Sequence, residues 1–426
     1  MRTPIRTLLP GLLAAGLAVP AAAQDRPPTG KKLDDLLERF LAADGKTDAG
    51  FAEQQQVLAE VAKVPALAAR DVDKWKKKIE KLWRKGRKLE KSGDNWFFEN
   101  KTGRYIVGGK NETKKPKGLA INMHGGGVGS GDAGPAASAY GPALSGIGYV
   151  MIAPEVLERT ECGWTDSGTE EFVLDLIDCA LRTWQIDPDH VVLVGHSMGG
   201  YGSWTLGGHH ADRLAAIAPS AGAPTPIQRA PGGPIIDIIE GVVPSLRNVY
   251  ISCYQSTDDP QVPPEPNQYA IRALIEAHKK WGGYEHEYWE VSDRGHGAPP
   301  GGHEAHVEKI VDKVRNPIPE RVVWQPVLPW KRQFYWLYWD APVANAVVVA
   351  DLDRANNSVK IECDKPTAGM SVLLDERVLD LGKEIVVTVN GTETFRGMVE
   401  PNLQTLLLTS DHPDPKLQFV ATAKAH

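Results

Sequence analysis

Ser197 lies at the centre of a Gly-x-Ser-x-Gly pattern, with Gly195 two residues before it and Gly199 two residues after it. The aliphatic run 191–194 predicts a buried strand before the pattern, and the residues that follow are compatible with a helix. A sharp turn from strand to helix needs glycine at both places, because the neighbouring backbones come too close for Cβ atoms. Such a turn exposes the serine hydroxyl as a nucleophile and directs the Met198 N–H toward an oxyanion.

Acidic and basic partners follow this serine in the order that a strand-turn-helix nucleophile requires. Asp258 and Asp259 come directly after a predicted strand at 248–254, and His296 follows another at 284–291. Successive parallel strands bring their carboxyl ends to one edge of a sheet, where a base and its orienting acid can meet the nucleophile. We expect His296 to be the general base, oriented by one of the two aspartates.

A glycine-rich loop follows the predicted strand 118–123. Its residues, from His124 to Gly127, predict a second oxyanion donor, for which Gly126 and Gly127 are the candidates. Residues 129–134 also fit the dinucleotide-binding pattern Gly-x-Gly-x-x-Gly, with Glu155 about twenty residues further on. That pattern begins five residues beyond His124 instead of in the turn itself, so we expect no nucleotide or other cofactor.

The strands that carry these residues alternate with helical patterns. Predicted strands at 118–123, 149–153, 191–194 and 215–220 are separated by helical segments such as 170–184. This alternation predicts an α/β protein with a doubly wound, mostly parallel sheet. A segment rich in proline and glycine, 223–245, is expected to shape the substrate pocket.

Five stretches of the chain together resemble the α/β-hydrolase superfamily, and within it the secreted esterases related to polyhydroxybutyrate depolymerases, feruloyl esterases and predicted peptidases. They are 186–188, 195–204, 215–219, Asp-Pro-Gln-Val-Pro at 259–263 and Gly-His-Gly at 295–297. The resemblance extends over about 95–316 and implies a catalytic domain at 94–316. It also implies that the acid is Asp259. The family usually carries His-Gly before the acid where this chain has Gln255-Ser256, which leaves Asp258 open.

The resemblance and the residues imply an exported serine hydrolase that cleaves carboxylic esters through an acyl-enzyme, without a metal or cofactor. A serine peptidase that uses the same three residues is an alternative within enzymes. A non-catalytic protein that binds carbohydrate or a surface is an alternative of another class.

The first residues have the pattern of an export signal. Arg2 and Arg6 precede the apolar run 8–19, and small residues end at Ala23, so residues 1–23 are expected to be a signal peptide cleaved near Ala23. The mature protein would be secreted or periplasmic. No other apolar run approaches the roughly 20 residues of a membrane span. The net charge of -6 does not indicate a nucleic-acid partner.

Residues 24–93 have helical periodicity and form a predicted N-terminal helical segment. Between Lys74 and Lys91 the chain has ten basic and two acidic residues. A basic amphipathic helix could lie on a membrane surface or an anionic polymer. We favour a solvated helix that packs through Trp75 and Trp83 against the catalytic domain.

Prolines mark a predicted linker at 317–330, followed by a small β-rich domain at 331–426 with a hairpin turn at Asn390-Gly391. The aromatic run 334–339 could stack on sugar rings, which would give the C-terminal domain a carbohydrate contact. We favour burial of both faces of this run.

The remaining histidines and cysteines carry weaker signals. His303 and His306 resemble a zinc motif, but they are three residues apart instead of the four of His-Glu-x-x-His, so we interpret them, like His209 and His210, as surface or packing residues. Cys162 and Cys179 could form a disulfide; isolated buried thiols are the alternative.

Overall fold

The computed structural model describes residues 26–109, 115–160, 163–166, 168–225 and 238–426. The expected signal peptide, Cys162 and residues 226–237 of the expected pocket segment lie outside the described residues. Within the described residues, no helix combines the length and the apolar character needed to cross a membrane.

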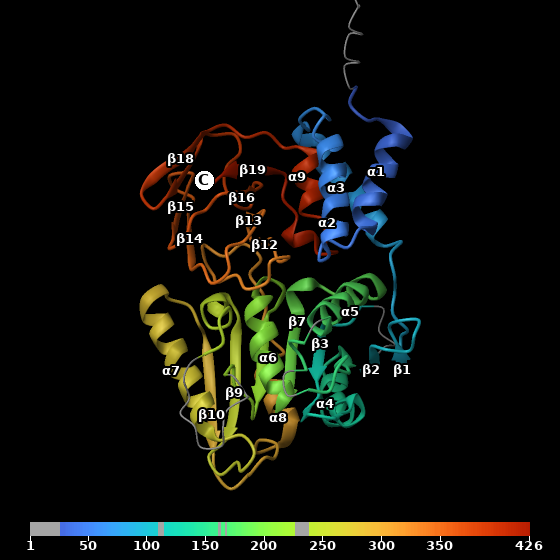
Figure 1. The fold of residues 1–426 in the computed structure, drawn as a ribbon, viewed down its shortest axis with the longest axis vertical. Coiled ribbons are helices and arrows are strands. Elements are labelled where there is room, and N and C mark those ends of the chain that lie inside the picture. The colour runs from blue at the N-terminus through green and yellow to red at the C-terminus, as the bar shows by residue number, and fades with distance from the viewer. Residues whose placement is uncertain (1–25, 110–114, 161–162, 167, 226–237) are drawn as a thin grey trace, which may run out of the picture.

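The centre of the molecule is an eight-stranded sheet with the order β1-β2-β6-β3-β7-β8-β9-β10 (Figure 1). The pairs β1–β2 and β2–β6 are antiparallel, and every later pair is parallel. The strands are β1 (Gly93–Trp96), β2 (Arg104–Gly109), β3 (Gly118–Met123), β6 (Tyr149–Pro154), β7 (Val191–His196), β8 (Ala216–Ser220), β9 (Tyr250–Ser256) and β10 (His286–Val291). This is the α/β-hydrolase fold, and the predicted fold class is confirmed.

Helices cover both faces of this sheet, which explains why its inner strands are mainly apolar. All residues of β3 and β6 are buried. Ala120, Val192 and Val194 pack on the side of α4 and α8, whereas Ile121 and Leu193 belong to the core on the side of α5, α6 and α7. These helices are α4 (Ala133–Gly146), α5 (Thr169–Thr183), α6 (Met198–His209), α7 (Pro264–Trp281) and α8 (Gly302–Glu308).

Three helices precede the sheet: α1 (Gly30–Ala42), α2 (Asp48–Val61) and α3 (Ala69–Trp83). One face of α1 is apolar and buried, at Leu33, Leu36, Leu37 and Phe40. Of these, α2 and α3 pack beside α9 (Leu403–Leu408), a helix of the C-terminal region (Figure 1). The expectation that Trp75 and Trp83 pack against the catalytic domain is corrected, because Nε1 of Trp83 donates to the Ser410 carbonyl of the C-terminal region.

The C-terminal region contains two further sheets. Their strands are β11 (Arg321–Trp324), β14 (Val348–Asp353), β15 (Ser358–Cys363), β17 (Ile385–Val389) and β18 (Thr392–Gly397) in one, and β12 (Gln333–Phe334), β13 (Leu337–Trp339), β16 (Met370–Leu374) and β19 (Ala421–Lys424) in the other.

Two details of this region differ from the expectation. The predicted linker 317–330 contains β11, because Val322, Val323 and Trp324 are buried and the strand pairs with β14. The aromatic run is not one strand: it turns at Tyr335, whose φ is 53°, so that Phe334 pairs with Leu337.

The aromatic run 334–339 is buried, as expected, and this bears on the predicted carbohydrate contact. Phe334, Tyr335, Trp336 and Trp339 are all 0% exposed. The run therefore offers no open aromatic face on which a sugar ring could stack.

The C-terminal region contacts the amino ends of the central strands. The guanidinium of Arg315, which is 2% exposed, binds Asp189 just before β7 and Asp414 of the C-terminal region, each at 2.7 Å. Lys331 binds Asp212 just before β8 at 2.7 Å. In Figure 1 the C-terminal sheets accordingly lie above the central sheet, and α8 lies at its lower end. The carboxyl edge of the sheet, where Ser197 follows β7, is about 20 Å from this amino edge, the length of a six-residue strand.

The described cysteines are free thiols. Cys179, Cys253 and Cys363 are all buried and unpaired. Because Cys179 is free, the Cys162–Cys179 disulfide considered from the sequence is not formed.

Candidate active site

Ser197 occupies a strained turn between β7 and α6. Its φ of 61° and ψ of -123° lie in a region that non-glycine residues rarely adopt, and such strain concentrates at functional sites. A Cβ at Gly195 would lie 2.3 Å from the carbonyl oxygen of Gly199, and one at Gly199 would lie 2.0 Å from that of Met123. The two glycines are therefore required by space. The Ser197 N–H donates to the Ser220 carbonyl at 2.8 Å, which ties the turn to β8.

His296 and Asp259 form a hydrogen-bonded pair at the carboxyl ends of β10 and β9. Nδ1 of His296 is 2.7 Å from Oδ2 of Asp259. The other carboxylate oxygen of Asp259 accepts the N–H groups of Gln261 and Val262 at 2.8 and 2.9 Å. The carboxyl group is fully buried, so its two oxygens are held in one orientation.

Asp258, the other candidate acid, contacts the loop instead of the imidazole. Its Oδ1 accepts the Ser256 hydroxyl and the N–H groups of Arg294 and Gly295. These bonds, led by that of Ser256, lower the pKa of Asp258. Asp258 thus fastens the backbone just before His296, and Asp259 contacts the ring.

His196 joins the histidine loop to the serine turn. Its Nε2 is 3.2 Å from the carbonyl oxygen of His296, and the two imidazole rings lie 4.7 Å apart between centroids. Within the described residues, no hydrogen bond joins the Ser197 hydroxyl to the His296 ring. Contacts of this kind often tighten only when substrate binds.

The glycine loop faces Ser197 through Gly125. A Cβ at Gly125 would lie 3.2 Å from Cβ of Ser197, whereas one at Gly127 would meet nothing within 4 Å. Gly126 and Gly127 form β4, which pairs with β5 (Ser130–Gly131). The predicted loop therefore reaches the serine, but the glycine that faces Ser197 is Gly125 instead of the predicted Gly126 or Gly127.

His124 fixes this loop. Val156 N–H donates to Nε2 of His124 at 3.1 Å, so Nδ1 carries the proton and donates to the Gly125 carbonyl at 2.7 Å. Burial lowers the pKa of His124, which favours this neutral form. With the Gly125 carbonyl held in this way, the Gly125 N–H finds no acceptor among the described residues.

Met198 is the first residue of α6, where backbone N–H groups have no partner within the helix. Its N–H also finds no acceptor in the described part of the chain. Two backbone donors without acceptors, at Met198 and Gly125, thus lie next to Ser197. Such donors can stabilise negative charge on an oxygen bound beside the serine.

The remaining motifs are occupied by internal contacts. Glu155, the ribose-binding position of a dinucleotide fingerprint, binds Arg104 and Arg159 at 2.9 and 2.8 Å. Nε2 of His306 bonds to the Ser252 carbonyl at 2.8 Å. His209 and His210 are packing residues, as one of the two expected alternatives had it, because both contact the buried carboxylate of Glu170 at 2.7 Å. Among the described residues, no three histidine, cysteine or acidic side chains gather as a metal site.

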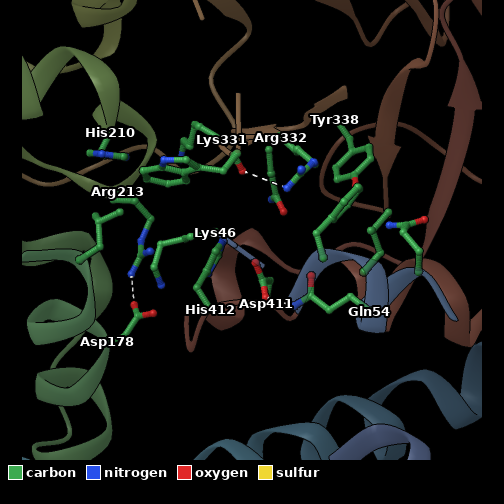
Figure 2. Close-up of a pocket in the computed structure, with 16 residues that line it drawn as sticks. Lys46, Gln54, Asp178, His210, Arg213, Lys331, Arg332, Tyr338, Asp411 and His412 are labelled. Carbon is green, nitrogen blue, oxygen red and sulfur yellow. Dashed lines mark hydrogen bonds and ion pairs between the residues drawn. The ribbon is translucent and has the colours of Figure 1, made fainter. Parts of the chain in front are cut away.

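A separate cavity of about 100 Å³ lies between α2, α5 and the C-terminal region (Figure 2). Its lining includes Lys46, Asp178, Arg213, Arg332 and Asp411. Arg213 precedes β8, so the cavity lies toward the amino edge of the sheet and away from Ser197. We therefore do not assign the catalytic chemistry to it.

Comparisons with known proteins found similarity to solved structures alone. The scan of protein-family models and the search of curated proteins produced no match. A thermostable esterase is 19% identical, over 52% of this chain and 63% of that chain, with a TM-score of 0.39. This chain therefore spans less than two thirds of that esterase.

Two further solved structures also have low sequence identity and TM-scores below 0.4. A ferulic acid esterase from Anaeromyces mucronatus is 17% identical, over 51% of this chain and 87% of that chain, with a TM-score of 0.36. An S-formylglutathione hydrolase from Agrobacterium tumefaciens is 12% identical, over 54% and 98% of the two chains, with a TM-score of 0.39.

Proposed function

We propose that this α/β-hydrolase-fold protein is a serine hydrolase that cleaves carboxylic esters through an acyl-enzyme, with Ser197 as nucleophile, His296 as base and Asp259 as orienting acid. The observation that carries the proposal is the 2.7 Å bond between His296 and Asp259, on a loop that His196 holds against the strained Ser197 turn. An Asp that accepts from Nδ1–H leaves Nε2 unprotonated and able to act as a base.

In the first step, Nε2 of His296 takes the proton of the Ser197 hydroxyl while Oγ forms a bond to the ester carbonyl carbon. The carbonyl oxygen becomes an oxyanion, which the N–H groups of Met198 and Gly125 stabilise. When the tetrahedral intermediate collapses, the C–O bond to the alcohol breaks and His296 gives its proton to the departing oxygen. Water then attacks the acyl-enzyme by the same route and releases the acid.

The choice of Gly125 as second donor departs from the sequence-based candidates Gly126 and Gly127. Gly125 approaches Ser197 more closely than Gly127, and its carbonyl is already held by His124. Gly126 and Gly127 pair with β5, so strand pairing competes for their backbone groups.

The proposal includes export and cleavage near Ala23, because residues 1–23 have the composition of a signal peptide. Mass determination of the mature protein from a secreting host would test this part separately from the chemistry.

The test of the chemistry is a panel of p-nitrophenyl esters and peptide amides, together with labelling by a fluorophosphonate. We expect ester hydrolysis and stoichiometric labelling of the wild type, and a loss of about 10⁶-fold in turnover with no labelling for Ser197→Ala. Cleavage of peptide amides by the wild type, lost in Ser197→Ala, would favour a peptidase. A wild type that neither labels nor turns over any substrate would favour a binding protein.

A further inference from the structure

Helix α3 carries a straight line of four cations, which we call the basic stripe: Arg70, Lys74, Lys77 and Lys81. Spacings of four, three and four residues place all of them on one face of the helix. Each of the four is exposed. None of the four has a carboxylate partner among the described residues, although acidic residues lie on the neighbouring elements.

Basic residues that flank the stripe use those neighbouring acids. Lys78 binds Asp34 of α1, and Lys85 binds Glu38 at 2.9 Å. Lys76 lies 3.8 Å from Asp375 of the C-terminal region. The structure thus neutralises the cations on either side of the stripe and leaves the stripe itself unpaired.

The apolar face of α3 is used for packing. Ile79 and Trp83 are buried, and Nε1 of Trp83 donates to the Ser410 carbonyl at 2.9 Å. Trp75 and Leu82 pack against the same core. A helix that binds by insertion into lipid needs a free apolar face, and α3 does not have one. Its outward face can attract a partner only by charge and hydrogen bonding.

The stripe brings like charges together on one helix face, and none of its four cations forms an ion pair among the described residues. Like charges three and four residues apart repel one another and destabilise a helix. The segment from Lys74 to Lys91 has ten basic and two acidic residues, a net charge of +8 in a chain whose total is -6. Departures of this kind that no packing contact compensates are expected where a protein binds something.

We propose that the basic stripe binds a linear anionic polysaccharide, one that carries a carboxylate or sulfate group on successive sugars. The cations recur about once per helical turn, ~5.4 Å, which is close to the length of one sugar residue. A polymer on α3 would lie near the C-terminal region (Figure 1), because Trp83 contacts Ser410. Ser197 lies at the opposite edge of the sheet and stays accessible. The inference does not depend on the proposed function.

The test measures binding of the intact protein to polygalacturonate and to heparin at about 50 mM and 200 mM salt, beside duplex DNA and phosphatidylglycerol vesicles. The test variant is Lys74→Glu/Lys81→Glu, which turns like-charge neighbours into opposite pairs. The control is Lys279→Glu/Lys383→Glu, which changes the net charge equally at two exposed lysines of α7 and the C-terminal region.

We expect binding of the wild type to a polysaccharide that weakens about tenfold or more at the higher salt, and a loss of about tenfold or more in the stripe variant. The control should change affinity less than about twofold, since its charges are remote and screened. The stripe variant should also keep or raise the melting temperature, which separates lost binding from unfolding. No binding by the wild type, an equal loss in the control, or tighter binding to DNA or vesicles would overturn the proposal.

Discussion

The imidazole of His196 is hydrogen-bonded to the backbone of His296, one hundred residues further along the chain. Nε2 of His196 lies 3.2 Å from the His296 carbonyl oxygen, and Nδ1 lies 2.8 Å from the Ser220 hydroxyl. A carbonyl can only accept, so Nε2 carries the proton and Nδ1 accepts from Ser220. Burial, together with His296 and His303, lowers the pKa of His196 to about 4, and the ring is neutral at pH 7.

This contact predicts that His196→Ala lowers kcat about 10-fold to 100-fold while KM changes little, because a base that shifts by an ångström loses much of its effect. His196→Gln keeps an N–H donor of similar reach and should restore part of the loss. Steady-state kinetics on one ester measure the split between kcat and KM. Equal losses in both variants, or a change confined to KM, would show that His196 does not position the base.

Substitutions of the two neighbouring aspartates should lower kcat to very different extents. Asp259→Asn removes the acceptor of the His296 Nδ1–H and should lower kcat about 10³- to 10⁴-fold. Asp258→Asn weakens bonds to the Ser256 hydroxyl and the loop backbone, not to the imidazole, and should cost less than about tenfold.

Steady-state hydrolysis of one ester gives kcat for both aspartate variants, the rate of Ser197 phosphonylation by a fluorophosphonate gives an independent comparison, and circular dichroism checks folding. A larger loss for Asp258→Asn than for Asp259→Asn would indicate that Asp258 is the acid that orients His296. That result would revive the alternative that the departure at Gln255-Ser256 left open.

The fold could be predicted from the sequence because strands that are covered on both faces consist mainly of apolar residues. β3 and β6 are buried throughout and β7 is buried up to His196, and all three consist mainly of apolar residues, so their alternation with helices can be predicted from the sequence. The short strands of the C-terminal region left weaker marks. The turn at Tyr335 interrupts an aromatic run that has no glycine or proline, and β11 lies among prolines that indicate a linker.

The candidate site was predictable where a residue type implies its own chemistry, as for Ser197 and His296. His196 and Gly125 were missed for a different reason. His196 binds a backbone carbonyl one hundred residues away, and no side-chain pattern encodes such a partner. Nothing in residue type separates Gly125 from Gly126 and Gly127; they differ in their approach to Ser197 and in the pairing of β4 with β5, which depend on the folded loop. The adjacent His124 was the available signal, since a buried histidine before glycines can fix one carbonyl.

The glycine loop provides a matched pair of substitutions. Gly125→Ala places a methyl group 3.2 Å from Cβ of Ser197 and 3.1 Å from the His196 carbonyl, and should lower kcat/KM about tenfold or more. Gly127→Ala adds the same group where nothing lies within 4 Å, and should change kcat/KM less than about twofold. Kinetics on a short-chain ester compare them. A larger loss for Gly127→Ala would return the oxyanion role to β4.

The last prediction concerns His412, in the C-terminal region beside the cavity of Figure 2. Neither ring nitrogen of His412 has a partner among the described residues, and both are buried. Burial, reinforced by the positive charges of Arg213 and Lys331, lowers the pKa of His412 to about 4. The carboxylates of Asp414 and Asp178 oppose this shift but do not cancel it.

A histidine with a depressed pKa binds fewer protons in the folded state than in the unfolded one. Above about pH 6.5, His412 therefore does not change the free energy of unfolding. As the pH falls toward 4, the unfolded state binds the extra proton and the folded protein loses stability. The expected loss from His412 at pH 5 is about 2 kcal/mol relative to pH 8. Urea denaturation at the two pH values should show a smaller difference for His412→Gln than for the wild type. His278→Gln, a change at an exposed histidine of α7, is the control and should keep the wild-type difference. An unchanged difference in His412→Gln would show that this ring is not held neutral by the fold.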